Sequence, residues 1–328
     1  MTHLSALFIG GNGVISSACS RLAVQQGIDV TLLNRGRSTT RPPIEGARSL
    51  VADAGDPAAM RAAIGGREFD VVVNFHVFDA QRAAHDIELF SGRTGQYVFI
   101  STAAGYQKPV LRIPITESTP LRNPFSPYAQ NKIASELRFG EAYRASGFPV
   151  TIVRPSHTYD PTLIPLDGGW TVIDRMRRGG KTVIHGDGTS MWTLTHQEDF
   201  ARAFTGLLGN PQIVGDSVHI TSDEALTWDA IAHCLARAAG ADADIVHVAS
   251  GQVVREIPEW EGPIIGDKSY SLVFDNSKIK RLVPGWAATI PFWRGAQEIV
   301  AWYDAHPERQ VVDPAIDQAL DRLAAMAA

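Results

Sequence analysis

The stretch "ALFIGGNGVIS" (residues 6–16) runs from an apolar segment through a glycine-rich turn into a helical pattern. Gly10, Gly13 and Ser16 give a G-x-x-G-x-x-S spacing, in which Ser16 takes the place of a third small residue that has only to pack closely. Glycine lets the backbone turn sharply and approach a pyrophosphate, which then lies against the amides at the N-terminus of the helix. The alternative is a plain strand-to-helix turn. Because the stretch follows a buried strand, we predict a dinucleotide-binding loop. Its predicted cofactor contacts are Gly10, Gly13, Val14 and Ile15.

The pattern of this stretch repeats through the first half of the chain. Short apolar runs that do not alternate with polar residues predict strands buried on both faces. These runs lie at 6–10, 29–34, 49–53, 70–75, 96–101 and 149–155. Helix-like spacing lies between them, at 14–26, 56–64, 79–92 and 127–146. Alternating strands and helices predict an α/β fold with a doubly wound (Rossmann) parallel sheet.

After residue 155 proline and glycine become more frequent, and the strand–helix alternation loosens. We expect a helix at 197–209 and a strand at 217–222 to return to the sheet, with further helices at 227–239 and 292–303. The predicted dinucleotide-binding domain is 1–160 plus about 190–222. The predicted substrate-binding lobe is 161–189 and 223–328. The crevice between the two is the expected ligand site.

The bulk composition argues against several kinds of partner. Of 328 residues, 45% are hydrophobic, and the formal net charge is −5 without a run of like charges. Neither nucleic acid nor an anionic membrane is therefore a predicted partner. Two cysteines, Cys19 and Cys234, indicate no disulfide framework, and no stretch approaches the roughly 18 to 20 apolar residues of a membrane span. We expect a cytoplasmic protein without a metal site, and leave its oligomeric state open, a homodimer included.

The end of the second predicted strand bears on the choice of cofactor. An NAD site usually has Asp or Glu about 20 residues after the glycine loop, to accept a hydrogen bond from the ribose 2′-hydroxyl. This chain has Asn34 and Arg35 there. Arg35, with Arg37 or Ser38, would hold a 2′-phosphate by charge-assisted hydrogen bonds; the alternative is a solvated arginine. NADP is thus favoured over NAD. Asp53, at the end of the third strand, is placed to accept from the adenine amino group.

Two hydroxyls and a Tyr-x-x-x-Lys pair supply the candidate chemistry. Ser101 and Thr102 end the fifth strand, and "SPYAQNK" (126–132) places Tyr128 and Lys132 four residues apart on one helix face. Using a tyrosine with a pKa near 10 as a base near pH 7 costs about 4 kcal/mol. One ammonium about 4 Å away supplies that amount at an effective dielectric of 20. We predict that Lys132 lowers the pKa of Tyr128, which acts as acid/base, while Thr102 holds the substrate oxygen. Further predicted cofactor contacts are Ala54, Phe75, Pro155, Tyr128 and Lys132.

Taken together, the motifs resemble the extended short-chain dehydrogenase/reductase superfamily, in its NAD-dependent epimerase/dehydratase branch. The matching segments, in order, are the glycine loop, "FISTAAGY" (99–106), "ITESTPLRNPFSPYAQNK" (115–132), "VRPSHTYDP" (153–161) and "HGDGTSMWTLTHQEDFARAF" (185–204). The resemblance covers about residues 5–210. It implies that the residue four before Tyr106, which is Thr102 rather than Ser101, is catalytic, and that Lys132 also reaches the nicotinamide ribose.

Departures from the family pattern narrow the expected reaction. Dehydratases of this branch carry Asp-Glu after the catalytic Thr, where this chain has Ala103 and Ala104, so we do not expect a 4,6-dehydratase. Many nucleotide-sugar epimerases have an arginine at the position of Trp192, which cannot neutralise a diphosphate. His157 stands where the family often has a substrate-contacting Asn. Trp192 and His157 are thus candidate substrate contacts, with Thr102, or else core residues.

Three hypotheses follow from the sequence. The first is an NAD(P)-dependent oxidoreductase acting on a secondary alcohol or ketone of a sugar-like compound. The second is a nucleotide-sugar epimerase with a retained cofactor. The third is a non-catalytic protein that binds RNA, as some plastid relatives in this branch do; the acidic charge and the presence of Thr102, Tyr128 and Lys132 argue against it.

Overall fold

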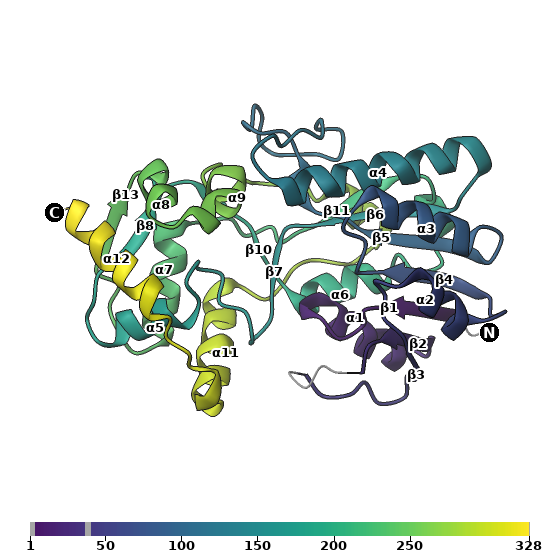
Figure 1. The fold of residues 1–328 in the computed structure, drawn as a ribbon, viewed down its shortest axis with the longest axis horizontal. Helices are drawn as coiled ribbons and strands as arrows, with labels where there is room; N and C mark the ends of the chain where they lie inside the picture. The colour runs from purple at the N-terminus through teal and green to yellow at the C-terminus, as the bar shows by residue number, and fades with distance from the viewer. Residues whose placement is uncertain (1–3, 37–40, 328) are drawn as a thin grey trace.

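Parallel strands that are apolar on both sides form a seven-stranded sheet, as the sequence predicts. The computed structural model of the chain describes residues 4–36 and 41–327 (Figure 1). The strands, in the order in which they pair, are β11 (Ser217–Ile220), β6 (Val150–Pro155), β5 (Thr94–Ile100), β4 (Phe69–Asn74), β1 (Ser5–Ile9), β2 (Asp29–Asn34) and β3 (Arg48–Val51). All of these pairings are parallel. The chain order reverses between β1 and β4, the switch point where doubly wound sheets bind ligands.

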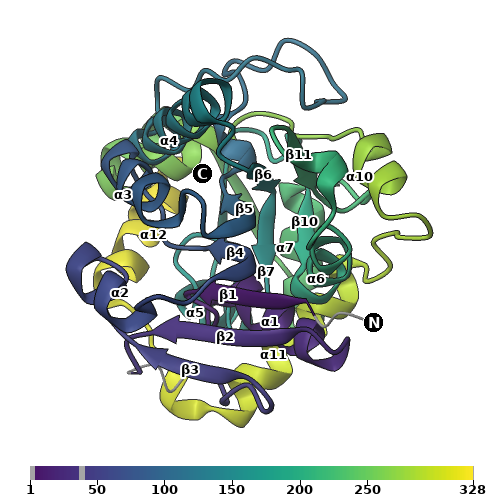
Figure 2. The ribbon, with the colours of Figure 1, turned by 90° about the vertical axis from the view of Figure 1, so that its right-hand side faces the viewer.

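Helices cover both faces of the sheet, with α2, α3 and α4 on the left in Figure 2. On one face lie α1 (Val14–Gln25) and α6 (Gln197–Thr205), whose apolar side chains share a core with Phe8 and Val73. On the other face lie α2 (Pro57–Ile64), α3 (Ala80–Phe90) and α4 (Pro127–Ser146), packed on Leu7 and Val72. The predicted α/β fold class is confirmed. In the first 155 residues each predicted strand and helix is present, with ends that differ by at most two residues.

The smaller part of the molecule has its own hydrophobic core, on the left in Figure 1. Its helices are α5 (Trp170–Arg177), α7 (Trp228–Ala238), α8 (Ser250–Glu256), α9 (Glu261–Pro263), α11 (Phe292–Ala305) and α12 (Pro314–Ala327). Its strand pairs are β7 (His157–Tyr159) with β10 (Leu194–His196), β8 (Thr182–His185) with β13 (Ile245–Val248), and β9 (Met191–Trp192) with β12 (Leu226–Thr227).

Short helical turns occur along the chain and are η1 (Ala103–Gly105), η2 (Pro211–Ile213), η3 (Pro258–Trp260), the π-helical η4 (Ile264–Lys268) and η5 (Pro307–Arg309). Helix α10 (Ser277–Leu282) instead contacts β11, and its Ile279 lies in the core with α1 and α6.

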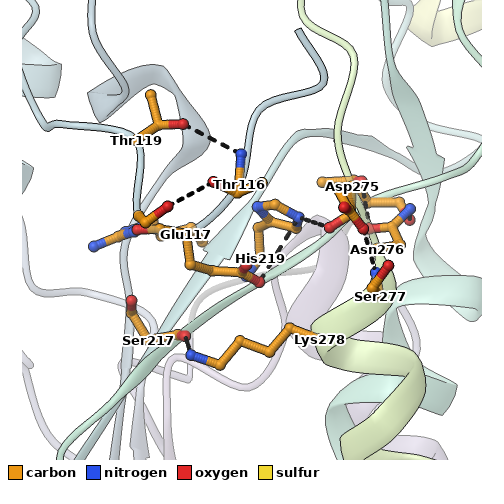
Figure 3. A network of polar contacts seen from close by, with 12 residues as sticks. Thr116, Glu117, Thr119, Ser217, His219, Asp275, Asn276, Ser277 and Lys278 are labelled. Atoms are coloured by element: carbon orange, nitrogen blue, oxygen red, sulfur yellow. Dashed lines mark hydrogen bonds and ion pairs between the residues drawn. The ribbon is translucent and has the colours of Figure 1, made fainter. Parts of the chain in front are cut away.

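A buried polar network fastens the segment before α10 to the edge strand β11 (Figure 3). The His219 Nε2–H donates to the Asp275 carbonyl oxygen at 2.8 Å, and the His219 backbone N–H donates to Glu117 Oε1 at 3.2 Å. His219 has no solvent exposure, so these bonds are shielded from water. Because Phe274 precedes Asp275 and lines a large cavity, the network holds one wall of that cavity against the sheet.

Candidate active site

The glycine loop has the backbone shape that a bound dinucleotide would need. Gly10 has φ +86°, and a Cβ added there would lie 2.0 Å from the Cδ2 of His76, so only glycine fits. Asn12, in the same loop, has a buried side-chain oxygen without a hydrogen-bond partner among the described residues. A cradle that a Cβ would fill, together with an unsatisfied polar atom, is what a bound pyrophosphate and ribose would complete.

Ser16 does more than pack closely, which corrects the expectation from the sequence. Its hydroxyl donates to the Gly10 carbonyl oxygen at 2.7 Å and accepts from the Gly13 N–H at 2.6 Å. Since Gly13 is the N-cap of α1 and has no side chain, Ser16 supplies the capping oxygen. The loop is thereby tied to the first turn of the helix.

A cavity of about 480 Å³ lies beside the glycine loop, at the ends of β2 and β3. Asn34, Arg35, Asp53 and Ala54 line it, as predicted for the adenosine end of a dinucleotide. Asn34 and Asp53 accept hydrogen bonds from the backbone N–H two residues further on, so both side chains shape their own loops. Arg35 is exposed to the cavity. The predicted contacts Ser38 and Arg37 lie outside the described residues.

Arg41, six residues after Arg35, has a structural partner. Its guanidinium donates to Asp160 Oδ2 at 2.5 Å and to the Thr162 hydroxyl at 2.6 Å. This pair, in which the Asp160 side chain is buried and that of Arg41 partly exposed, links the loop after β2 to the chain beyond β7. The Arg41 guanidinium therefore holds the loop after β2 against residues 160–162.

A second cavity, of about 270 Å³, continues from the first towards the end of β5. The two share Gly10, Gly13, His76 and Phe78. The predicted residues that line the second cavity are Val14, Ile15, Phe75, Thr102, Tyr128, Lys132 and Pro155. Every predicted cofactor contact that the structure describes thus lies on one of the two cavities. His76 and Phe78, which follow β4 at the switch point, line both cavities and were not predicted from the sequence.

The start of helix α4 sets the position of Tyr128 and Lys132. Ser126 caps the helix by accepting from the Ala129 N–H at 3.3 Å, and Pro127 occupies the first turn, where its missing N–H costs nothing. Tyr128 therefore stands at the helix N-terminus and Lys132 one turn further on the same face. Tyr128 is 48% exposed and lines cavities on either side, whereas Lys132 is 2% exposed.

Lys132 is held by backbone carbonyls. Its ammonium donates to the carbonyl oxygens of Val77 at 2.7 Å and Ile100 at 2.8 Å. It also lies over the rings of Phe78 and Phe99, at 4.8 and 5.1 Å from the centroids. Burial lowers the pKa of Lys132 to about 7, although the negative charge of Glu136 acts in the opposite direction.

The prediction that the pKa of Tyr128 is lowered by Lys132 is wrong for this structure, where that pKa lies above its ordinary value. Burial raises the pKa of Tyr128, a hydrogen-bond contribution from Thr102 lowers it, and the charge of Asp267 raises it. The Lys132 Nζ lies 5.9 Å from the centre of the Tyr128 ring. A full charge at that distance is worth about 3 kcal/mol at an effective dielectric of 20, but a lysine with a pKa near 7 carries only part of that charge at neutral pH. The pKa of Tyr128 therefore lies above its ordinary value in this structure.

The two hydroxyls after β5 have different partners. Ser101 donates to Glu136 Oε1 at 2.5 Å, and Glu136 is in turn paired with Arg154 at 2.6 Å, all in the protein interior. Thr102 caps η1 by accepting from the Ala104 N–H at 3.2 Å and contributes to the environment of the Tyr128 hydroxyl. Thr102 rather than Ser101 is therefore free to act on a substrate.

A third cavity, of about 450 Å³, opens on the other side of Tyr128 and Thr102. His157 and Trp192 both line it, and the Trp192 indole N–H donates to His157 Nδ1 at 3.2 Å. Burial lowers the pKa of His157 to about 3, so this histidine is neutral. Trp192 is 3% exposed and packs on Trp228, so it is a core residue with one edge on the cavity.

The charged residues of this third cavity were not found from the sequence. Asp167, Asp267 and Lys268 line it. They come from a proline- and glycine-rich loop and from the π-helical turn η4, neither of which carries a pattern that points to a site. Only the folded chain brings them to the same cavity as Tyr128.

Residues 6–220 match the NAD dependent epimerase/dehydratase family. The chain belongs to this family of extended short-chain dehydrogenases/reductases. The match covers the sheet, the glycine loop and the Tyr128–Lys132 helix, and it confirms the resemblance found in the sequence.

Individual relatives in the epimerase/dehydratase family have different activities. The chain is 27% identical over 291 residues to the 2′-dehydrokanamycin reductase of Streptomyces kanamyceticus, a match covering 86% of this chain and 80% of that protein. It is 25% identical over 254 residues to a chloroplast stem-loop binding protein of 41 kDa from Arabidopsis thaliana, covering 74% and 65%. Among solved structures, an epimerase from Methanothermobacter thermautotrophicus has a TM-score of 0.77 at 17% identity, covering 94% of each chain.

Proposed function

We propose that this protein is an NAD(P)-dependent oxidoreductase that transfers hydride to or from a secondary alcohol or ketone of a sugar-like compound, with Tyr128 as the acid/base. The supporting observation is that Thr102 and Tyr128 stand at the junction of two cavities. One continues into the glycine loop, where Gly10, Gly13, Arg35 and the other predicted contacts would hold the dinucleotide. The other enters the smaller part of the molecule, which we propose as the substrate-binding lobe.

The proposed chemistry uses the residues at that junction. A bound reduced nicotinamide supplies the hydride. The Thr102 hydroxyl donates a hydrogen bond to the substrate carbonyl oxygen and holds it next to Tyr128. As hydride reaches the carbonyl carbon and the C=O π bond breaks, the Tyr128 hydroxyl gives its proton to that oxygen, which leaves an alcohol and a phenolate. Lys132 carries only part of its positive charge at neutral pH, and to that extent it favours the phenolate until the phenolate is protonated again.

The name of one relative supports ketone reduction as the direction of the reaction. The relative from Streptomyces kanamyceticus is named as a reductase. Tyr128 would then be the proton donor, a role that suits a phenol protonated at neutral pH.

We propose NADP as the preferred cofactor. The end of β2 offers a guanidinium at Arg35 and no carboxylate, since Asn34 occupies the usual acidic position and is bonded to the Gly36 N–H at 2.8 Å. Burial lowers the pKa of His76, and the positive charge of Arg35 on the same cavity lowers it further. A 2′-phosphate would meet an exposed guanidinium there, whereas a 2′-hydroxyl would lack its usual acceptor.

The second candidate is a nucleotide-sugar epimerase, which the family description supports. An epimerase oxidises and re-reduces the same carbon and retains its cofactor, so the two candidates differ in what the purified protein carries. RNA binding, suggested by the name of the chloroplast relative, is tested by adding a stem-loop RNA at low and high salt.

The test is to purify the protein, release any bound nucleotide by denaturation, and identify it by mass spectrometry. A reductase is expected to release little cofactor and to oxidise added NADPH with a member of a panel of keto-sugars. Near-stoichiometric NAD⁺ that cannot be exchanged would support the epimerase. Tight, salt-sensitive RNA binding without any NAD(P)H binding would overturn the oxidoreductase.

A further inference from the structure

His76 lies where the two cavities beside the glycine loop meet. It lines both the cavity of about 480 Å³ at the ends of β2 and β3 and the cavity of about 270 Å³ that continues towards Tyr128. Gly10 and Gly13 border the same two cavities. A glycine loop of this kind receives the pyrophosphate in the middle of a dinucleotide. His76 therefore borders, from the end of β4, the place where the loop would hold the pyrophosphate.

The imidazole ring of His76 turns one edge to the glycine loop. A Cβ added at Gly10 would lie 2.0 Å from the His76 Cδ2 and 2.3 Å from its Nε2. The ring also packs on Phe78, edge to face, with 5.9 Å between the ring centres. Neither ring nitrogen has a hydrogen-bond partner within residues 4–36 and 41–327, and the residue is exposed. The Nε2 atom is thus an unused hydrogen-bonding group next to the loop.

The backbone of His76 is fixed from the protein interior. Its N–H donates to Asn74 Oδ1 at 2.7 Å, and the Asn74 amide in turn donates to Asp86 Oδ2 at 2.6 Å. Asn74 and Asp86 have no solvent exposure, so water does not compete for these bonds. They hold the turn after β4, and with it His76, beside the glycine loop.

The charged groups around His76 are mostly positive. The charges that act on its ring are those of Arg35 after β2, Asp53 after β3, Arg82 on α3 and Lys132 on α4. The glycine loop and the first turn of α1 carry no charged side chain. Asp79, in the same turn as His76, is bonded to the Arg82 backbone N–H at 2.8 Å, where it caps α3. Three cations and one nearby carboxylate make a setting that favours an anion.

The same surroundings determine when His76 is charged. Partial burial lowers its pKa, the three cations lower it further, and Asp53 acts in the opposite direction. Without a ligand the ring is therefore mainly neutral at neutral pH. A pyrophosphate carries negative charge, and negative charge next to an imidazole favours the protonated ring.

We propose that His76 binds the pyrophosphate of the dinucleotide through its ring and takes up one proton from the solvent as the cofactor binds. Proton uptake of this kind rests on the proposed function, which places a nicotinamide dinucleotide in the two cavities. A protonated imidazole gives the phosphate a charge-assisted hydrogen bond, which is stronger than the bond from a neutral ring.

The direction of the pH dependence follows from this proton. Between the pKa of His76 in the free protein and its higher pKa in the complex, binding takes up a proton, so the affinity falls as pH rises. Above both values the ring is neutral in both states, and below both it is charged in both, so the affinity no longer changes. One proton alters the affinity by at most about tenfold per pH unit.

The test is titration calorimetry with ADP-ribose, which carries the pyrophosphate but no 2′-phosphate. The 2′-phosphate of NADP is a poor probe, because a phosphate monoester has a second pKa of about 6 and would itself titrate. Titrations at about pH 5.5, 6.5 and 7.5, each in two buffers of different ionisation enthalpy, give the affinity and the number of protons taken up. Wild type should bind ADP-ribose about threefold or more tightly at pH 5.5 than at pH 7.5 and take up protons.

His76→Gln keeps a hydrogen-bond donor but cannot become charged. Because the position is exposed, glutamine is accommodated there. The variant should bind ADP-ribose to within about twofold of wild type at pH 7.5 and lose the gain in affinity at pH 5.5. His233→Gln is the matched control and should behave as wild type, since His233 is an exposed histidine of α7 that lines none of the three cavities.

Lys132 is the other group at these cavities that can take up a proton, since its pKa is about 7. Lys132→Met is therefore measured beside the histidine variant and should keep the gain in affinity at pH 5.5. If His76→Gln shows the same pH dependence and proton uptake as wild type, if wild type shows neither, or if Lys132→Met alone removes both, His76 is not the proton acceptor. The oxidoreductase proposal fails separately: it falls if neither ADP-ribose nor NAD(P)H binds at any of these pH values, and it stands if they bind without a pH dependence.

Discussion

Replacing Lys132 by Met should remove a pH dependence of stability that the structure assigns to this one side chain. Burial lowers the pKa of Lys132 from 10.5 to about 7. Between those values the unfolded chain binds the proton more tightly than the folded chain, so the free energy of unfolding rises with pH. The lowered pKa of Lys132 reduces the free energy of unfolding by about 4 kcal/mol at pH 7 and by about 2 kcal/mol at pH 9. Wild type should therefore gain about 2 kcal/mol relative to Lys132→Met over that interval.

Urea unfolding at pH 7, 8 and 9 measures this difference directly. Methionine is one atom shorter than lysine and loses the two bonds to the carbonyls of Val77 and Ile100, so the variant is expected to be less stable at every pH. The prediction concerns only how the stability difference between wild type and Lys132→Met changes with pH. Lys181→Met is the control, because Lys181 is exposed in an ion pair with Asp244, and it should run parallel to wild type. If the free energy of unfolding of Lys132→Met also changes with pH in parallel with wild type, the pKa of Lys132 is not lowered by burial.

Three further substitutions, the last with Ser101→Ala as its comparison, test the cofactor and substrate contacts. Arg35→Asp should weaken NADPH binding by at least tenfold and NADH binding much less, since it removes a phosphate partner and adds repulsion; equal losses in a fluorescence titration would exclude Arg35 as the reader of the 2′-phosphate. Gly10→Ala should abolish binding of both cofactors, because the new Cβ would lie 2.0 Å from His76 at a positive φ; an unchanged dissociation constant would contradict the cradle. Thr102→Ala should lower turnover about 10²-fold through loss of one hydrogen bond to the reacting oxygen. Ser101→Ala should mainly lower the thermal stability, because the Ser101 hydroxyl is bonded to a buried glutamate. If Ser101→Ala lowers turnover and Thr102→Ala does not, Ser101 is the residue that acts on the substrate.

The parts of the fold that follow from local patterns could be predicted from the sequence. Runs such as "DVVVNF" (70–75) are apolar on both sides and short, so they specify buried parallel strands without reference to the rest of the chain. The glycine loop and the Tyr128–Lys132 spacing are likewise local, because a sharp turn needs Gly10 and one helix face needs a separation of four residues. These are the features that the structure brings together around the switch point.

The parts that depend on distant segments could not be predicted in this way. The pKa of Tyr128 follows from burial and from Asp267, which lies far along the chain in η4, and not only from the lysine one turn away. The polar wall of the substrate cavity, with Asp167 and Asp267, is assembled from a loop and a π-helical turn that carry no periodic pattern. The second role of Ser16 appears only when the Gly10 carbonyl is folded back over the helix start.

The most direct test of the central claim is the rate of hydride transfer in Tyr128→Phe. With the keto-sugar found in the reduction panel, wild type and variant are saturated with NADPH and a single turnover is followed by the absorbance of the reduced nicotinamide. The account predicts a rate about 10² to 10⁴-fold lower in the variant, with the NADPH dissociation constant changed less than about twofold, because only the proton-donating hydroxyl is removed and the ring still packs. A variant that transfers hydride as fast as wild type would contradict Tyr128 as the acid/base.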